Sequence, residues 1–332
     1  ELNGSHLGVY ARDPTDTDTS PNQHNYGRLG VRTERAENGL EIVSIIEQSP
    51  AAKGPMALQV GDVITAVEFD PIEEDETLEM ALRDRIGEET VISIERTMED
   101  GEPSSFSVFL TPISFGAERQ LAYEQWRREN ARLVEEWSNG RLGYIHIQGM
   151  NQPSLDVFER DLFAAAEGKD GLVLDVRNNG GGWTTDRVLS SIMVQPHAWT
   201  VPRGASWDNT GHYPQDRLFI QRYTMPMNLL CNEKSYSNAE IMSHAFKTLD
   251  RGTLVGQQTH GSVISTGGFA LLDGTFVRLP FRGWFVDDGT GRDMELNGAM
   301  PDIVVPQRPE AEVAGEDEQL RTAVEDLMKR LD

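Results

Sequence analysis

A turn rich in hydroxyl groups separates an apolar run from a segment with a helical pattern. The sequence Asn232-Glu-Lys-Ser-Tyr-Ser-Asn-Ala-Glu-Ile241 follows the apolar run Met225–Cys231. Ser and Asn at such a junction satisfy the free amide groups of a helix's first turn. A helix N-terminus also offers N–H groups and the positive end of a dipole to a developing oxyanion. The turn therefore supports two interpretations, an ordinary helix cap and the site of a nucleophilic serine.

A glycine-rich loop is the second candidate for chemistry. Asp175-Val-Arg-Asn-Asn-Gly-Gly-Gly182 leaves an apolar run through three consecutive glycines. Glycine lets the backbone turn sharply and present its N–H groups without a side chain in the way. A phosphate-binding loop is the rival interpretation, but the sequence has no Gly-Lys-Ser/Thr after these glycines and no GxGxxG. We therefore interpret the segment as an oxyanion loop at the end of a strand.

Histidine is the usual general base at neutral pH, and the chain has seven. No lysine occurs between Lys247 and Lys329, which excludes a lysine base downstream of the turn. Five histidines are set aside because they lie in a linker, in loops, on a strand or too far along a helix: His24, His197, His212, His146 and His244. The residues alone leave His6 and His260 open, each as a structural or a catalytic group.

The elements that must position these residues alternate between strand and helix from residue 115 onward. We predict strands at 143–147, 171–176, 225–231 and 252–256, and helices at 115–138, 155–166 and 238–249. The run after Gly171 is apolar on both faces, as a covered sheet requires. The single cysteine, Cys231, belongs to such a run and is interpreted as a buried structural residue. This half of the chain is predicted to be an α/β domain.

The half before residue 115 has the pattern of a small β-rich domain. A polar, turn-rich stretch at 11–27 is predicted to be a loop or linker. β-like runs follow at 29–33, 41–46, 62–67, 90–95 and 105–110, with helical candidates at Pro50–Ala57 and Thr77–Arg85. Together they predict a partly open β-barrel with two helices.

Charge and composition exclude some classes of binding partner. The formal net charge is −24, so the phosphate backbone of a nucleic acid and an anionic membrane surface would both be repelled, and we expect no nucleic-acid partner. No run approaches 18 consecutive apolar residues, so we expect no membrane partner. The chain has no HExxH and no cysteine pair, so neither a metal nor another cofactor is expected.

Three short motifs in the β-rich half resemble the PDZ family. Gly27-Arg-Leu-Gly-Val31, Ser49-Pro-Ala-Ala52 and Val60-Gly-Asp-Val-Ile64 occur in the order typical of that family. A PDZ groove binds an extended peptide as an added strand, and successive N–H groups of a loop receive its terminal carboxylate. The resemblance implies that this loop consists of Arg28, Leu29, Gly30 and Val31. The alternative is a plain turn before a strand.

The order of the remaining motifs resembles a superfamily of serine proteases. The PDZ segment is followed by Gly143-Tyr-Ile-His-Ile147, by Asp175–Gly182 and by Ser237-Asn-Ala-Glu-Ile241, as in the C-terminal processing peptidases of family S41, which include tail-specific and tricorn-type members. The resemblance implies a crotonase/ClpP-like α/β core with Ser237 as nucleophile and Ser235 as a turn residue. The amides of Asn238 and Gly181 would form the oxyanion hole.

The tricorn type differs from the tail-specific type in its general base. Tail-specific members use a lysine about 25 residues after the serine, where this chain has Ser262. The opening Glu1-Leu-Asn-Gly-Ser-His6 resembles the tricorn-type motif, which implies that His6 is the base and that Ser5 orients it. Glu295, just before the turn at 298–302, would complete the tetrad, although Leu296 replaces an asparagine that is common there. Without the motif, Glu295 would be interpreted as a surface carboxylate of an acidic protein.

We therefore predict three regions: residues 1–26 as the end of a first catalytic subdomain and a linker, 27–114 as a PDZ domain, and 115–332 as the α/β serine peptidase domain. The resemblance implies hydrolysis of unfolded polypeptides or oligopeptides by a homo-oligomer in the cytoplasm, with a periplasmic or secreted location as the alternative. Because no initiator Met is present, we expect this sequence to begin inside a longer protein. The resemblance implies that it is the C-terminal half and that β-propeller portions come first.

Two other functions compete with this prediction. In the first, the chain is an inactive scaffold whose PDZ loop recognises peptide C-termini; the complete set of Ser5, His6, Ser237 and Glu295 argues against it. In the second, it is a crotonase-like hydratase or isomerase, a fold related to this peptidase core. That class has no reason to carry a PDZ domain, and the sequence shows no coenzyme A site.

Overall fold

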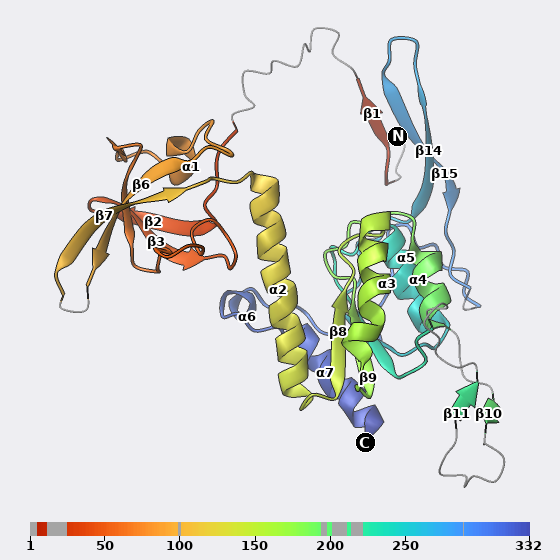
Figure 1. Cartoon of the computed structure of the whole chain (residues 1–332). Helices are drawn as coiled ribbons and strands as arrows, with labels where there is room; N and C mark the ends of the chain where they lie inside the picture. Colours follow the sequence, from red (N-terminus) through yellow and green to blue (C-terminus); the bar gives the residue numbers. More distant parts are fainter. Residues whose placement is uncertain are drawn as a thin grey trace. The chain divides into compact units, whose positions relative to one another are not determined.

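The computed structural model describes residues 5–11, 25–98, 101–193, 198–200, 211–213, 222–287 and 289–332. The chain divides into two compact units, one made of residues 1–12 and 130–332 and the other of residues 13–129 (Figure 1). Helix α2 (Phe115–Trp137) begins in the unit of residues 13–129 and ends in the unit that contains residues 130–332. None of the helices in the described ranges is long and apolar enough to cross a membrane.

The unit of residues 13–129 is built on an antiparallel sheet with the strand order β2-β3-β4-β6-β7. The strands are β2 (Val31–Ala36), β3 (Gly39–Ile45), β4 (Val63–Val67), β6 (Thr90–Thr97) and β7 (Pro103–Leu110), and a short β5 (Asp70–Pro71) pairs with β4. Helix α1 (Leu78–Ala81) contributes to the core through Leu78. Leu29, Ile42, Ile64 and Ile92 are buried in the same core, so every predicted β-like run of this half contributes to, or adjoins, a real strand.

The two helices predicted in this half need correction. Residues 50–57 form turns instead of a helix, because Ala51 N–H donates to Leu29 O and Leu58 N–H to Ala51 O, and because Gly54 has φ of 90°. The second predicted helix, Thr77–Arg85, is real only over α1. It ends early because Asp84 has φ of 57° and donates its N–H to Asn25 O.

The other unit contains a five-stranded parallel sheet with the order β16-β13-β12-β9-β8. Its strands are β8 (Leu142–His146), β9 (Gly171–Asp175), β12 (Met227–Cys231), β13 (Thr253–Gly256) and β16 (Ile303–Val304). Helices α3 (Gln152–Ala166), α4 (Thr185–Ile192) and α5 (Asn238–Thr248) connect them, and α7 (Glu318–Leu331) follows at the end of the chain. The predicted alternation of strand and helix is confirmed.

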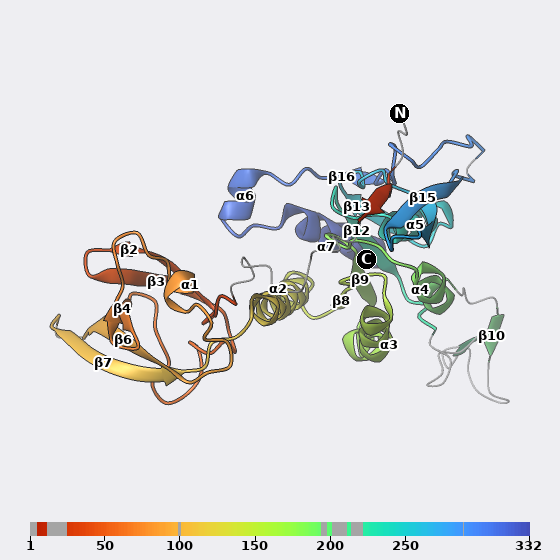
Figure 2. The same cartoon turned by 90° about the horizontal axis from the view of Figure 1, so that it is seen from above.

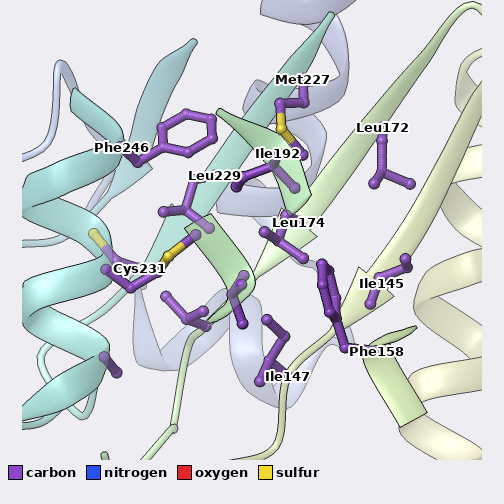
Figure 3. Packing of buried hydrophobic residues seen from close by; sticks show 14 of the residues in the cluster. Ile145, Ile147, Phe158, Leu172, Leu174, Ile192, Met227, Leu229, Cys231 and Phe246 are labelled. Carbon is purple, nitrogen blue, oxygen red and sulfur yellow. The ribbon is translucent and has the colours of Figure 1, made fainter. Parts of the chain in front are cut away.

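Side chains of this sheet alternate between two cores. Leu172, Leu174 and Leu229 pack with Phe158 of α3 and Phe246 of α5 (Figure 3). The intervening residues on the opposite face, including Val173 and Leu230, pack against α7 and the last turns of α2. Figure 2 shows the strands between α3 and α7. Burial on both faces explains why these strands are apolar throughout.

A hairpin between β13 and β16 was not predicted. Strands β14 (Ile264–Ala270) and β15 (Phe276–Gly283) pair with each other, and β1 (Gly8–Tyr10) adds to the free side of β15 (Figure 1). Gly8 pairs with Arg278 and Tyr10 with Phe276. This pairing holds the N-terminal strip, including Ser5 and His6, against the unit that carries Ser237.

The remaining elements are short. Strands β10 (Ala198–Thr200) and β11 (Gly211–Tyr213) form an antiparallel pair, and α6 (Pro309–Val313) precedes α7. His212, predicted to lie in a loop, is therefore part of a strand. His24 and His197 lie outside the described residues.

Candidate active site

Ser237 lies between the end of β12 and the first residue of α5, in a strained backbone conformation. Its φ is 55° and its ψ is −115°, a combination that residues with a side chain rarely adopt. Such strain persists only where the surrounding structure enforces it, and it concentrates at functional sites. A sharp turn from strand to helix is also the geometry that exposes nucleophilic serines in other hydrolases. An ordinary helix cap has no need of this strain.

The turn before Ser237 is fixed by the other serine. Ser235 is fully buried, and its hydroxyl donates to the carbonyl of Val176 at 2.8 Å. The Asn232 amide donates to the same hydroxyl at 3.0 Å. Ser235 thus connects the turn to the end of β9, as expected for a turn residue.

The single cysteine is a buried structural residue, as predicted. Cys231 lies within β12, and burial raises the pKa of its thiol.

The glycine loop lies directly against Ser237. A Cβ atom on Gly181 would be 2.7 Å from Ser237 Cβ and 3.0 Å from the amide nitrogen of Asn238. With φ of 84°, Gly181 also has a backbone conformation that favours glycine. The Asn238 amide is in the first turn of α5, where N–H groups have no partner within the helix. The Gly181 amide already donates to Asn179 Oδ1 at 2.9 Å, so it would bind an oxyanion only by sharing or exchanging that bond.

Ser5, His6 and Glu295 form one hydrogen-bonded group, although Glu295 lies 290 positions after Ser5 in the chain. The Ser5 amide donates to Glu295 Oε1 at 2.6 Å, and the Ser5 hydroxyl donates to Oε2 at 3.1 Å. Ser5 Oγ also lies 2.7 Å from His6 Nδ1. Glu295 is buried and accepts a further bond from the amide of Val263 at 2.9 Å. It is therefore a fixed internal acceptor rather than a surface carboxylate.

These bonds determine which ring nitrogen of His6 is available as a base. The Ser5 hydroxyl has one proton, which it donates in the hydrogen bond to Glu295 Oε2. Ser5 Oγ must then accept from His6, which places the ring proton on Nδ1 and leaves the Nε2 lone pair free. A histidine oriented in this way can take a proton from a nucleophile and return it to a leaving group.

Tyr236 connects the histidine to the turn that contains Ser237. Its hydroxyl lies 3.2 Å from His6 Nδ1, and the centres of the two rings are 4.7 Å apart. In the described part of the chain His6 and Ser237 are not hydrogen-bonded to each other. Catalytic hydrogen bonds are often long before substrate binds. Sequence reasoning missed Tyr236, whose position directly before the serine was its only signal.

Glu240 is a second residue of the site that sequence reasoning missed. Its side chain is fully buried, and Oε1 accepts from the amides of Ser237 and Ser262, both at 2.9 Å. Oε2 accepts from the Thr259 hydroxyl at 2.7 Å and from the Gly261 amide. Glu240 thereby joins the strained Ser237 to the loop at 259–262. The spacing Ser-x-x-Glu, which is that of a capping box, was the available signal.

The other histidine left open by the sequence has a different environment. His260 Nδ1 lies 2.7 Å from Ser262 Oγ, and the His260 ring packs edge-on against Tyr236 with centres 5.0 Å apart. It therefore contacts the tyrosine from another side and makes no bond with Ser5 or Glu295 in the described structure. His146 is buried with Nε2 2.8 Å from Arg177 O, and the His244 ring lies beside Thr248 on α5.

The electrostatics of His6 suit a base. Partial burial lowers the pKa of His6 below its ordinary value of 6.5, Arg278 and His260 lower it further, and Glu295 opposes them. A lowered pKa keeps the imidazole neutral, and therefore able to accept a proton, at neutral pH.

We expect the Arg278→Gln variant to move the acidic limb of the pH profile of kcat/KM to higher pH. Removing the cation stabilises the charged imidazolium, so the pKa of His6 rises and more alkaline conditions are needed to deprotonate it. Arg282→Gln, on the same strand, is the matched control because Arg282 does not act on His6. An unmoved or downward-moved limb in Arg278→Gln would show that His6 is not the titrating base.

The predicted PDZ-loop residues lie together in the other unit. Leu29 is buried, Gly30 has φ of 77°, and Val31 begins β2. Arg28 contacts Glu79 and Glu118. A cavity of about 470 Å³ lies between β2 and α1. Among the described residues, no group of three or more His, Cys, Asp or Glu side chains is arranged to hold a metal ion.

Comparisons with known proteins match both halves of this architecture. Residues 141–305 match the model of peptidase family S41, and residues 27–110 match that of the PDZ domain. Tricorn protease homolog 1 of Streptomyces coelicolor is 32% identical over 90% of this chain and 28% of its own length. The tricorn protease of Thermoplasma volcanium is 30% identical over 86% of this chain and 26% of its own length.

A solved structure of the tricorn protease matches as well. It superposes with a TM-score of 0.74 and 25% identity, covering 92% of this chain and 29% of that structure. The chain thus spans less than a third of the length of each of these relatives. The match extends over nearly the whole of this chain, including both the β-rich and the α/β half. The chain belongs to the tricorn-like serine peptidases of family S41 and carries a PDZ domain.

Proposed function

We propose that the chain hydrolyses peptide bonds by a tetrad of Ser237, His6, Ser5 and Glu295. The observation that carries the proposal is the hydrogen-bonded group Glu295, Ser5 and His6, which is held at the nucleophile turn by Tyr236. This arrangement orients one histidine, leaves its Nε2 free, and connects its ring to Tyr236, the residue directly before the strained Ser237. A triad is defined by such geometry and not by the order of its residues in the chain.

In the proposed reaction Ser237 Oγ attacks the carbonyl carbon of the peptide bond while His6 Nε2 takes the hydroxyl proton. The amides of Asn238 and Gly181 donate to the carbonyl oxygen as it gains negative charge. His6 then gives its proton to the leaving amine, and the C–N bond breaks. A water molecule then attacks the carbonyl carbon of the acyl-enzyme while His6 takes its proton. The bond to Ser237 Oγ breaks, and His6 returns the proton to the serine.

Ser5 and Glu295 act through the histidine. Their bonds keep the Nδ1 proton in place and stabilise the imidazolium that forms during the reaction. Unfolded polypeptides or oligopeptides are the proposed substrates. A homo-oligomer and a cytoplasmic location are part of the same proposal, and both rest on the resemblance to tricorn proteases.

Labelling with a fluorophosphonate tests this function directly, because the probe reacts with activated serines. We expect the wild-type chain to be labelled and the Ser237→Ala and His6→Ala variants to remain unlabelled. The controls are Ser190→Ala, an exposed serine on α4, and His244→Ala, a histidine further along α5; both should label as the wild type does. Labelling that persists in Ser237→Ala would refute the assignment of the nucleophile. A wild-type chain that stays unlabelled beside an active serine protease would favour the peptide-binding scaffold.

A further inference from the structure

A cavity in the PDZ domain lies beside the edge strand of its sheet. β2 is the edge strand of its sheet, and the cavity of about 470 Å³ lies between this edge and the segment that leads into α1. Val31 and Leu40 provide apolar lining. In peptide recognition by strand addition, the peptide backbone pairs with such an edge, and its terminal carboxylate meets the N–H groups of the preceding loop. In this chain that loop is Leu29–Val31.

A carboxylate of the chain itself accepts a hydrogen bond from this loop. The amide of Gly30 donates to Glu118 Oε1 at 3.0 Å. Arg28 Nε lies 3.8 Å from Glu118 Oε2, and Arg28 Nη1 lies 2.5 Å from Oε1 of Glu79 on α1. All four residues belong to the unit of residues 13–129. One of the amide groups that would receive a peptide terminus, that of Gly30, therefore already donates to an anion.

Several contacts hold Glu118 in place. It belongs to the first turn of α2, next to Phe115, whose ring lies 5.3 Å below the Arg28 guanidinium. The Glu118 side chain is only 14% exposed, and this burial raises the pKa of Glu118 while Arg28 and the Gly30 amide oppose the change. Farther along the helix, Gln125 Oε1 accepts from the Glu47 amide at 2.9 Å, which fixes α2 to the same unit.

A second anion would be repelled at this position. Arg28 is the cation of the cluster, and it already faces two carboxylates, Glu79 and Glu118. A peptide terminus placed at Gly30 would bring a third carboxylate within a few ångströms of them, and like charges at that separation are unfavourable. An uncharged stretch of backbone meets no such repulsion and can still pair with the edge of β2.

We propose that Glu118 takes the place of the peptide's terminal carboxylate, so that this groove binds extended internal segments of a polypeptide and does not select free C-termini. Glu118 is thus a specificity-determining residue of the PDZ domain. The proposal does not depend on catalysis by Ser237. It concerns which part of a polypeptide the groove accepts.

The experiment compares two pools of fluorescein-labelled octapeptides of identical mixed composition, one ending in a free carboxylate and the other in a carboxamide. Binding is measured by fluorescence anisotropy on the full chain carrying Ser237→Ala, so that probes are not cleaved. When Ser237→Ala is the only substitution in the protein, the two peptide pools should bind with the same affinity. In Glu118→Ala, the free carboxylate should gain about tenfold over the amide, the ratio expected for one hydrogen bond to a charged group.

Two further variants make the result specific. Glu118→Gln removes the charge but keeps an acceptor for the Gly30 amide, so it should shift the ratio in the same direction by less. Glu124→Ala is the matched control, because Glu124 lies on the same helix and, among the described residues, bonds to its neighbours Gln120 and Arg127. Thermal unfolding of each variant verifies that it is folded. A starting chain that already prefers free carboxylates, or Glu118 variants whose ratio stays unchanged, would overturn the proposal.

Discussion

Replacing His6 by alanine is expected to lower kcat/KM for a peptide substrate roughly 10⁵-fold to 10⁶-fold, about as far as Ser237→Ala does. The reason is that Ser237 without a base remains a weak nucleophile, and the leaving amine has no proton donor. Residues that act as a unit give strongly non-additive effects. The double variant should therefore be no less active than either single variant.

The measurement is hydrolysis of an internally quenched peptide by the wild type, both single variants and the double variant. His260→Ala is the matched control, since the sequence left that residue open as a base and the structure gives it no bond to Ser5 or Glu295. It should retain most of the activity. If His260→Ala abolished turnover while His6→Ala retained it, the two histidines would exchange roles and the proposed tetrad would be wrong.

Glu240→Gln is expected to lower the free energy of unfolding by about 3 kcal/mol and to abolish most of the activity. The carboxylate accepts from the amides of Ser237, Gly261 and Ser262 and from the Thr259 hydroxyl, all in a fully buried position. A carboxamide has one oxygen and one NH₂ group, so one buried N–H would face another donor. The loss includes activity because the same bonds hold Ser237 in its strained conformation.

Urea denaturation and peptide hydrolysis measure the two effects in parallel. Glu233→Gln, an exposed glutamate in the same turn, removes an equal charge and should change neither quantity appreciably. A Glu240→Gln variant with wild-type stability would mean that the buried bonds contribute little. One that is destabilised yet fully active at low temperature would show that Glu240 supports the fold without positioning Ser237.

Local pattern was sufficient for much of the fold. The apolar runs of β9 and β12 and the helical period of α5 are properties of consecutive residues, and they placed the strands and helices of the parallel sheet. The same approach overestimated the helix at 50–57, because apolar spacing does not reveal that the Ala51 amide bonds to Leu29. It also missed the hairpin of β14 and β15, whose glycines and exposed residues give no clear period.

The candidate site also contains residues that a local motif identified and residues that no local motif identified. Ser237 and the glycine loop each carry a local motif, and the structure places Gly181 in contact with the serine. For Ser5, His6 and Glu295 the residues alone left alternatives open, and only the family resemblance selected among them. The hydrogen bonds that join Ser5 to Glu295 span 290 positions of the chain, so no local pattern encodes them.

By itself the sequence determined the order of strands and helices, the polar turns that end them and the family motifs, because all of these depend on neighbouring residues. Only the tertiary structure decided that β1 pairs with β15, that His6 lies against Tyr236, that Ser237 is strained, and that Glu118 accepts from the Gly30 amide. The physical reason is that each of these depends on contacts between distant segments. Their free energy comes from hydrogen bonds and burial that exist only after the chain has folded.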